Sequence, residues 1–428
     1  MIRRRLRLPG AVAVAATALS LSGFAGASSA ATLAGTVSAT PAPWTPYVVS
    51  ADSNVNMITQ CGPRMYAVGT FTRLSGPGQA SVTRRNIFSF DATTGAISSW
   101  DPNVNGTVNS IALSPDCSSA YIGGKFTAVG ATSVRNLAKI STTTGAVDHT
   151  FGDNANGQVS TLTLTGGHLL IGGYFSSIND TATGYVGSLN PASGKNDGYI
   201  RIPISGTFPN TTTHIYKFEL SHSATRLLVS GAFTSVGGRT DMQIFMLDLG
   251  ATSATLDPWY SRLFNGVCTA SERFFVKGFN WSPDDSRIYI ATTGYKGATL
   301  CDVAAAFSSS ANSDQPPIWI NKTGCDSLYA TVADNANVYI GGHERWANNP
   351  SGCDNAGPGA VSRPGIGDID PLTGTATTWN PTRSRGHGVD DLYLDPAGRL
   401  WVSSDNGDNS YTKCANKYHP GICMFPRS

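Results

Sequence analysis

The sequence predicts an all-β fold, a seven-bladed β-propeller, and three observations carry that prediction. A phrase of the type YIGG recurs along the chain at intervals of 49 to 62 residues. Each recurrence is followed by a Gly-rich loop, an apolar strand and a polar turn such as DATTG at 91–95. No 3.6-residue apolar period persists long enough for a long helix. Units of four short strands repeated around an axis are the blades of a propeller.

Seven positions mark the repeat, each being the second small residue of the YIGG-like phrase. They are Gly69, Gly124, Gly173, Gly231, Thr292, Gly342 and Ser404. An apolar strand and a turn precede the marker, as in VNSIALSPDCSSAYIGG (108–124). A later strand ends on an aromatic residue, as in AISSW (96–100). Seven markers therefore predict seven blades, each bounded by turns rich in Gly, Asp, Pro and Ser.

The two ends of the chain predict how the ring closes. The seventh unit lacks a final strand with its aromatic residue, whereas the segment PWTPYVV (43–49) carries Trp44, which matches Trp100 and Trp379. We therefore expect the N-terminal segment to form the outer strand of the last blade. Closure of this kind removes exposed strand edges, which otherwise pair with other chains.

Residues 1–30 have the pattern of a signal peptide. Four arginines precede the apolar run AVAVAATALSLSGFAG, and small residues follow it. Their removal leaves 26 basic and 28 acidic residues, a net charge of −2. The predicted organisation is a signal peptide at 1–30, a linker at 31–43 and the propeller at 44–428. We expect a secreted monomer with no membrane span after cleavage and no nucleic-acid partner, because the mature chain has no basic stripe.

Eight cysteines lie in the mature part, and no CxxC pair occurs among them. An even number behind a signal peptide predicts disulfides. Positions in the repeat predict pairing in sequence order, since each pair belongs to one unit or to the same turn of neighbouring units. The predicted disulfides are Cys61–Cys117, Cys268–Cys301, Cys325–Cys353 and Cys414–Cys423.

Several stretches resemble a known family. They include FTSVGG (233–238), GGHERWANNP (341–350) and WNPTRSRGHGVDDLYLDPAGRLWVSSD (379–405). They are similar to secreted actinobacterial proteins built from delta-sixty-type propeller repeats, and the resemblance covers residues 44 to 428. It implies a propeller fold and an extracellular location, and it implies no particular reaction.

Motifs for chemistry are absent from the sequence. There is no GxSxG elbow and no HExxH motif. Asp390 and Asp391 are adjacent, so on a strand they face opposite ways and do not form a glycosidase pair. The loops 152–157 and 403–410 carry oxygen ligands of the kind that calcium prefers, but neither has EF-hand spacing. We interpret them as turn caps and predict no cofactor and no metal.

Two departures from the repeat predict the ligand site. The loop 343–365 follows the second strand of unit six, and the segment 383–391 enters unit seven. Both leave their blades on the same face, so we expect their long polar side chains to share one cleft beside the axis. The predicted ligand residues are His343, Glu344, Arg345, Trp346, Arg385, His387 and Asp390. A third departure is Lys277, on an inner strand. In the alternative interpretation Arg345 pairs with a carboxylate internally and Trp346 packs between blades.

These features predict a binding protein at or near the cell surface whose ligand is a glycan or another extracellular protein. Trp346 would stack on a sugar and Arg345 would donate hydrogen bonds to it. Asparagines of the loops that enter units two and three would add polar contacts: Asn103, Asn105, Asn154 and Asn156. The alternatives are a secreted hydrolase or lyase acting on a polysaccharide, and a non-catalytic subunit of a secreted assembly. Propellers host both binding proteins and enzymes, so fold does not decide between these functions.

Overall fold

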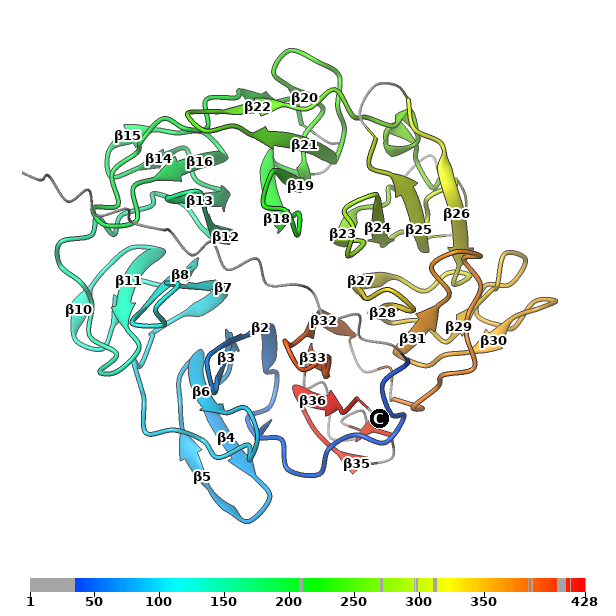
Figure 1. Cartoon of the computed structure of the whole chain (residues 1–428), viewed down its shortest axis with the longest axis horizontal. Helices are drawn as coiled ribbons and strands as arrows, with labels where there is room; N and C mark the ends of the chain where they lie inside the picture. Colours follow the sequence, from blue (N-terminus) through cyan, green and yellow to red (C-terminus); the bar gives the residue numbers. More distant parts are fainter. Residues whose placement is uncertain are drawn as a thin grey trace, which may run out of the picture. The chain divides into compact units, whose positions relative to one another are not determined.

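The protein is an all-β propeller. The computed structural model describes residues 35–207, 211–269, 272–295, 297, 299–310, 314–383, 385, 388–405, 413–415 and 417–427. Residues 33–428 belong to one compact unit. The predicted signal peptide lies outside the described residues. The described part of the chain has eight sheets of three or four antiparallel strands, and in seven of them the first strand faces a common axis (Figure 1).

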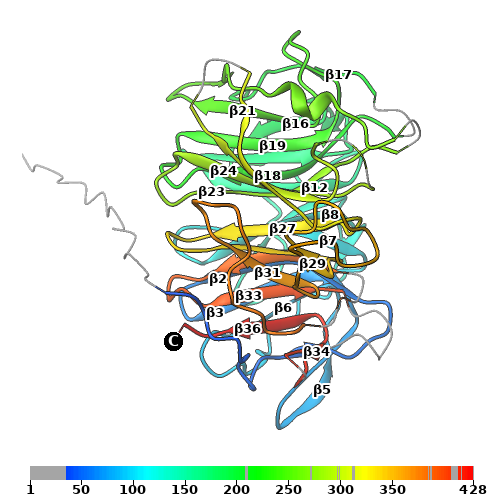
Figure 2. The same ribbon diagram turned by 90° about the vertical axis from the view of Figure 1, so that its right-hand side faces the viewer.

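The strands follow the order that the repeat predicts. The inner strands are β2 (Asn54–Cys61), β7 (Thr107–Leu113), β12 (Val159–Thr165), β18 (His214–Leu220), β23 (Val276–Trp281), β27 (Leu328–Ala333) and β32 (Val389–Leu394). They define units one to seven. The second strands are β3 (Arg64–Thr70), β8 (Ser119–Lys125), β13 (His168–Gly173), β19 (Arg226–Ala232), β24 (Arg287–Thr292), β28 (Val338–Gly342) and β33 (Leu400–Ser404). Figure 2 shows these sheets from the side.

The outer strands are less regular. The third strands are β6 (Ile87–Asp91), β11 (Leu137–Ser141), β16 (Val186–Leu189), β21 (Ile244–Leu249), β25 (Val303–Ser308), β31 (Ile366–Ile369) and β36 (Ile422–Phe425). Full fourth strands occur only in units four and five among the described residues, as β22 (Ala254–Leu256) and β26 (Pro317–Lys322). In units one, two, three and six a single bridge takes that place, as between Phe90 and Ile97.

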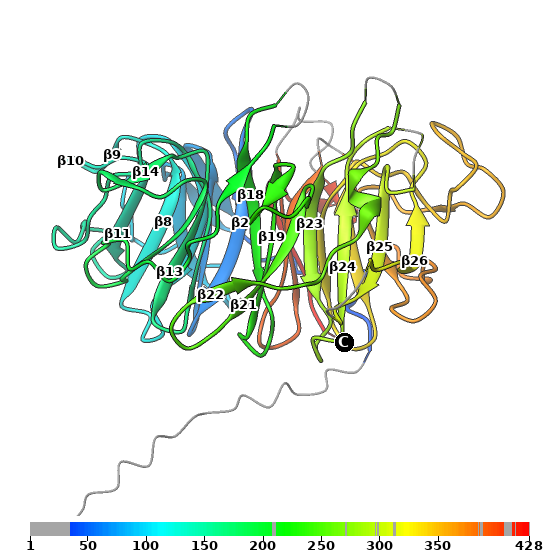
Figure 3. The same cartoon turned by 90° about the horizontal axis from the view of Figure 1, so that it is seen from above.

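Short hairpins decorate the loops. They are β4 (Arg73–Gly76) with β5 (Gln79–Thr83), β9 (Ala128–Val129) with β10 (Thr132–Ser133), β14 (Ser177–Ile178) with β15 (Thr181–Ala182), β29 (Trp346–Ala347) with β30 (Val361–Ser362), and β34 (Lys413–Cys414) with β35 (Lys417–Tyr418). β17 (Ile204–Ser205) pairs with β20 (Ser235–Val236), and one 3-10 helix spans Arg262–Asn265. β9, β10 and β14 lie at the end of the units where second strands finish (Figure 3).

Apolar residues of neighbouring sheets interlock to form the core. In unit one, the aromatic residue that ends the repeat, Trp100, meets Tyr66 of the second strand with ring centroids 5.5 Å apart. Trp379 meets Tyr339 in the same way in unit six, at 5.4 Å. These buried rings explain why each unit of the sequence ends on an aromatic residue, because they fill the space between outer segment and sheet.

The N-terminal segment lies beside the last strand, but its strand pairs elsewhere. Trp44 packs on Trp401 of unit seven at 5.9 Å, as the sequence comparison predicts. The N–H groups of Ser38 and Ala42 donate to carbonyls of Pro426 and Met424, each at 2.8 Å. β1 (Tyr47–Val48), however, pairs with β4 of unit one.

The expected outer strand at 43–49 is therefore misplaced. Pro43 and Pro46 lack N–H groups and so cannot donate to a regular ladder. The bridge and the hydrogen bonds to the last strand come from residues 37–42, whereas Thr45 and Val48 contact His419 and Pro420 of the same unit. No sheet of the described residues closes on itself. Units one and seven meet through this segment and a bridge between Asn54 and Asp405. Closure of the ring by the N-terminal segment stays a prediction.

The disulfides have the predicted pairing. The structure joins Cys61 to Cys117, Cys268 to Cys301, Cys325 to Cys353 and Cys414 to Cys423. The first links units one and two, and the others each staple one unit. Crosslinks of this kind stabilise the fold mainly by restricting the unfolded chain. No helix in the described part of the chain has the length and apolar character needed to cross a membrane.

Candidate functional site

Each inner strand has a β-bulge near its start, where pairing with the second strand skips one residue. The skipped residues of units one to seven are Asn56, Asn109, Ser160, Tyr216, Lys277, Tyr329 and Asp390. A bulge leaves its extra residue outside the ladder and re-aims its side chain. These seven side chains therefore occupy equivalent places near the start of the inner strands. We name this end of the units, where second strands also finish, the entry end.

In units one and two the bulge residue joins one unit to the next. The Asn56 Nδ2 donates to the carbonyl of Val108 at 3.1 Å. The Asn109 Nδ2 donates to the carbonyl of Val159 at 2.9 Å. Each amide thus satisfies a backbone acceptor just before the bulge of the neighbouring unit, which is a structural role.

In units four and five the same position belongs to a group of rings around an amine. We name this group the aromatic arc: Tyr174, His214, Tyr216, Phe275 and Lys277. The ammonium group of Lys277 lies 3.4 Å from the ring centroid of Tyr216 and 5.6 Å from that of Phe275. His214 stacks on Tyr174 with centroids 3.8 Å apart and meets Tyr216 edge-on at 4.4 Å. Tyr174 remains 43% exposed.

The arc is cationic but weakly so. Burial lowers the pKa of Lys277 to about 8, since desolvation disfavours the charged amine. No carboxylate of the described residues lies within ion-pair distance of Lys277, so the ring faces supply its attraction. Burial also lowers the pKa of His214 to about 4. Its Nδ1 contacts the carbonyl of Thr212 at 2.5 Å, and its buried Nε2 has no partner among the described residues.

Farther around the entry end, Asp326 holds the two predicted arginines together. Arg345 donates from its backbone N, Nε and Nη2 to this carboxylate at 2.7 to 3.0 Å. Arg385 donates from Nη2 at 3.0 Å. Asp326 is only 4% exposed, whereas Asp354, the other carboxylate on Arg345, is 72% exposed in its side chain. The guanidinium of Arg345 is therefore committed to internal ion pairs, as in the alternative interpretation of the sequence.

His343 lies beside these arginines. Its carbonyl accepts a hydrogen bond from the Nε of Arg385 at 2.6 Å. Its ring meets that of Tyr329, the bulge residue of unit six, at 5.2 Å. His343, Arg345 and Arg385 are thus together, as predicted from their two loops. His387 lies outside the described residues.

Glu344 and Trp346 differ from the expectation. Glu344 is fully buried, so its carboxyl does not reach the surface proposed for the ligand. Successive residues of an extended segment point to opposite sides, which turns Glu344 inward between His343 and Arg345. Burial raises its pKa to about 8, and Arg383 opposes that shift. Trp346 is half-buried and its indole N–H is enclosed without a partner among the described residues, so its polar edge is not offered to a ligand.

Asp390 forms no ion pair with Arg345 among the described residues. Burial raises the pKa of Asp390 to about 7 and the charge of Asp391 adds to that shift, whereas a hydrogen bond from Asn54 and the charges of Arg383 and Lys217 oppose it. Asp391 accepts a 3.0 Å ion pair from Lys217, which joins the inner strands of units four and seven. Burial would lower the pKa of Lys217, but the neighbouring carboxylates outweigh it and raise that pKa.

The asparagines expected to contact the ligand have local roles. The Oδ1 of Asn105 accepts hydrogen bonds from the N–H groups of Thr127 and Ala128 at 2.9 Å. Asn156 caps the equivalent turn of unit three through Ser176 and Ser177. Of the acidic loop 403–410, residues 406–410 lie outside the described residues. No cluster of three potential metal-binding His, Cys, Asp or Glu side chains occurs in the described part of the chain.

The sequence interpretation missed Tyr174, Tyr216, Phe275 and Asp326. A signal for one of them exists: aligning the units on their inner strands would have placed Tyr216 with Lys277 and Asp390 at one repeat position. Tyr174 directly follows a second strand and Phe275 directly precedes an inner strand, and neither belongs to a stretch that differs from the repeat. Asp326 follows Cys325 in a turn, where an aspartate is ordinary. Its role depends on two arginines from other loops and so is not visible locally.

Two cavities lie away from all these residues. One, of about 670 Å³, lies at the outside of unit three between 181–186 and 196–203. The other, of about 370 Å³, lies in the corresponding part of unit four, between 239–244 and 260–265. None of the ligand residues predicted from the sequence lines either cavity.

Comparison with known proteins assigns this chain to no family. No family model matches the chain, and no curated protein matches it. Among solved structures, the WD40 β-propeller domain of Doa1 is similar, with a TM-score of 0.46 and 12% sequence identity over 90% of this chain and 96% of that chain. A similarity of this extent carries no information about the ligand.

Proposed function

We propose that this protein is a secreted binding protein that recognises a glycan or another protein at or near the cell surface. The aromatic arc at the entry end is the surface that we assign to the ligand. One observation carries this proposal. The bulge position holds an asparagine that hydrogen-bonds the next unit in units one and two, but in units four and five it holds Tyr216 and Lys277, beside the exposed ring of Tyr174.

The chemistry of the arc suits such ligands. Flat aromatic faces cover apolar surface with little loss of side-chain entropy, and Tyr hydroxyls supply hydrogen bonds at their edges. Lys277 adds donors that no carboxylate of the described residues occupies. The inner strands hold these groups rigidly, and binding residues on a rigid scaffold lose little freedom when the ligand arrives.

Extracellular location is supported by two features. Four disulfides are typical of an oxidising compartment. The first 30 residues have the pattern of a signal peptide. The membership in the delta-sixty-type repeat family that the sequence resemblance suggests remains part of the same proposal.

An enzyme acting on a polysaccharide is the second candidate, and Lys277 is the observation that favours it. Burial lowers the pKa of this amine to about 8, which is the range in which a side chain acts as a general base at neutral pH. By contrast, the carboxyls of Glu344 and Asp302 are fully buried, so they are out of reach of a polymer.

The test is a glycan array probed with the mature protein, run beside a polysaccharide-degradation assay. We expect saturable binding to at least one glycan or cell-wall preparation without release of fragments. Tyr174→Ala should weaken that binding about 10-fold or more, because it removes an exposed stacking surface. Tyr418→Ala is the matched control, since Tyr418 is 49% exposed in unit seven and lies outside the arc.

Two results would contradict the proposal. Equal binding by the wild type and Tyr174→Ala would remove the arc from the ligand site. Release of fragments by the wild type, abolished in Lys277→Met, would replace binding by catalysis. A protein with neither activity that copurifies with secreted partners would instead support the role of a non-catalytic subunit.

A further inference from the structure

The strongest unexplained feature is the cavity of unit three, and the other units show what belongs in it. The residue three positions before each third strand's first paired residue lies between that strand and the outer segment that follows. The pairing register makes Ile87, Val186 and Ile366 equivalent first residues in units one, three and six. The residues three positions earlier, Arg84, Thr183 and Arg363, are therefore equivalent to one another.

In units one and six this place holds an arginine side chain. Arg84 donates from Nη1 to the carbonyl of Thr83 and from Nη2 to that of Ser98, each at 2.7 Å. Arg363 makes the same two bonds, to the carbonyls of Ser362 and Thr377. The outer residues Ser98 and Thr377 are equivalent, because their N–H groups both donate to the third strand at 2.9 Å.

Unit four reaches the same arrangement with a different residue. The outer residue is Asp257, whose N–H donates to the carbonyl of Met246 on the third strand at 3.0 Å. Arg239 donates from Nη1 to the Asp257 carbonyl at 2.9 Å. Asp241, at the position of Arg84, holds the Nε of Arg239 at 2.7 Å. Three units therefore place a guanidinium on one equivalent carbonyl.

Units two, five and seven fill the position in other ways. Val134 is buried in the core of unit two. Cys301 forms the disulfide to Cys268 in unit five. His419 is buried in unit seven, with its Nδ1 3.0 Å from the hydroxyl of Thr45. In unit three the position carries the short side chain of Thr183, and a cavity of about 670 Å³ opens beside it.

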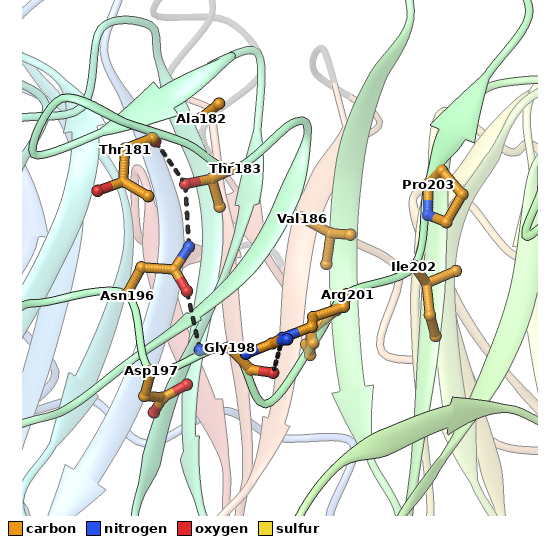
Figure 4. Close-up of a pocket in the computed structure, with 11 residues that line it drawn as sticks. Thr181, Ala182, Thr183, Val186, Asn196, Asp197, Gly198, Arg201, Ile202 and Pro203 are labelled. Atoms are coloured by element: carbon orange, nitrogen blue, oxygen red, sulfur yellow. Dashed lines mark hydrogen bonds between the residues drawn. The ribbon is translucent and has the colours of Figure 1, made fainter.

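In unit three the equivalent carbonyl has no donor among the residues that the structure describes. Asp197 is the outer residue, since its N–H donates to the carbonyl of Ser188 on the third strand at 3.2 Å. No hydrogen bond to the Asp197 carbonyl occurs among the described residues. Thr183 donates to the carbonyl of Thr181 at 2.8 Å and accepts from Asn196 at 3.2 Å, so it does not reach across (Figure 4). The cavity of about 670 Å³ opens here, a size typical of ligand pockets.

Two charged residues, Asp197 and Arg201, line the cavity. Burial would raise the pKa of Asp197, but hydrogen bonds from His168 and Ser188 outweigh it and lower that pKa; the carboxylate contacts the His168 Nδ1 at 2.7 Å and the Ser188 hydroxyl at 2.5 Å. Arg201 lies over Gly198 and donates from Nε to its carbonyl at 2.9 Å (Figure 4). Arg201 therefore serves the neighbouring carbonyl and leaves that of Asp197 open. Val186 and Ile202 supply apolar contacts for a methylene stem.

We propose that this cavity binds an arginine side chain of another protein. The guanidinium would donate to the carbonyl of Asp197, as Arg84, Arg239 and Arg363 do to the equivalent carbonyls of their own units. Planar donors matched to fixed acceptors favour arginine over lysine at such a place. This site is separate from the aromatic arc, and the proposal does not depend on the ligand assigned there.

The test on the native chain compares two peptides by titration calorimetry: acetyl-Gly-Ser-Arg-Ser-Gly-amide and the same peptide with citrulline. Citrulline has the shape of arginine without its charge. We expect the arginine peptide to bind about 10-fold more tightly, the loss that follows removal of a charged hydrogen-bond donor. Equal affinity, or no saturable binding of the arginine peptide, would overturn the proposal.

Two variants locate the site. Thr183→Arg should fill the cavity from within, abolish peptide binding and keep or raise the melting temperature, as the arginines of units one and six are accommodated. Ser133→Arg adds the same charge to an exposed hairpin of unit two and should bind like the wild type. Unchanged binding by a folded Thr183→Arg contradicts the proposal. If Thr183→Arg fails to fold, the citrulline comparison on the native chain decides.

Arg201→Gln distinguishes a cationic ligand from an anionic one. Removing this like charge should tighten binding of the arginine peptide by about 2-fold or more. Weaker binding would mean that Arg201 contacts the peptide favourably instead of repelling its guanidinium, and would overturn the proposal. A different result would also overturn it: an oligosaccharide binds the wild type and not Thr183→Arg, while neither peptide binds the wild type.

Discussion

Units one to three and units four to seven use the same backbone position in different ways. In the first region the bulge residues are Asn56, Asn109 and Ser160, and the two asparagines tie each unit to the next. In the second region they are Tyr216, Lys277, Tyr329 and Asp390, which make ring and charge contacts. A repeat thus fixes where a side chain begins, and the residue type decides whether that place serves folding or recognition.

The largest effect should come from breaking the joint between the two regions, where unit seven meets unit one. Deleting residues 31–50 removes Trp44 from Trp401 and the hydrogen bonds to Met424 and Pro426. We expect the melting temperature to fall by several degrees or more, because a buried edge becomes exposed. Unchanged melting would show that the N-terminal segment is not needed to close the ring.

Within the second region, Asp326→Ala should destabilise the protein by about 2–3 kcal/mol, because it leaves two partly exposed arginines without their buried carboxylate. Chemical denaturation measures the loss. Asp354→Ala is the matched control, since Asp354 contacts the same Arg345 from an exposed position. It should cost at most about 1 kcal/mol. Similar losses for both variants would mean that Asp326 is not the residue that holds the entry end together.

Glu344→Gln should change how stability depends on pH. The pKa of Glu344 is raised from 4.5 to about 8. The folded state therefore keeps a proton that the unfolded chain has released, and the associated stability is complete below pH 4.5 and lost as pH rises through 8. The variant should melt several degrees above the wild type at pH 8.5 and close to it at pH 4.5. The exposed Glu272→Gln should show no such divergence.

The ion pair between units four and seven should show non-additive energetics. Lys217→Met leaves Asp391 unpaired in a largely buried place and should cost about 2 kcal/mol, less than a fully enclosed pair. The double variant Lys217→Met with Asp391→Leu should recover most of that loss. Additive losses in the double-mutant cycle would indicate that the two side chains act independently.

The smallest effects test the comparison itself. Asn109→Ala should cost about 1 kcal/mol, the value of one neutral hydrogen bond. Lys277→Met should cost nothing or stabilise slightly, because it removes a desolvated amine that has no carboxylate partner among the described residues. A loss for Lys277→Met as large as that for Asn109→Ala would mean that both regions use the bulge position for stability.

The sequence by itself determined the features that repeat. The seven repeat markers from Gly69 to Ser404 locate the strands, because strands and turns depend on the alternation of apolar and polar residues and on turn residues that are close in sequence. The same register identified the partners of all four disulfides. It also brought the loop of His343 beside Arg385, since loops after second strands and before first strands leave a unit at one end.

Only the tertiary structure decided the contacts of each side chain that differs from the repeat. Glu344 turns inward and Arg345 is bound by Asp326, although their residue types suggested a ligand surface. Lys277 meets Tyr216 and Phe275, and Thr183 leaves open a place that other units fill. Burial, pKa and vacancy depend on atoms that units far apart in the chain bring together. Local pattern carries no record of those distances, so the fold and the disulfide partners could be predicted, whereas the partners of the unusual polar side chains could not.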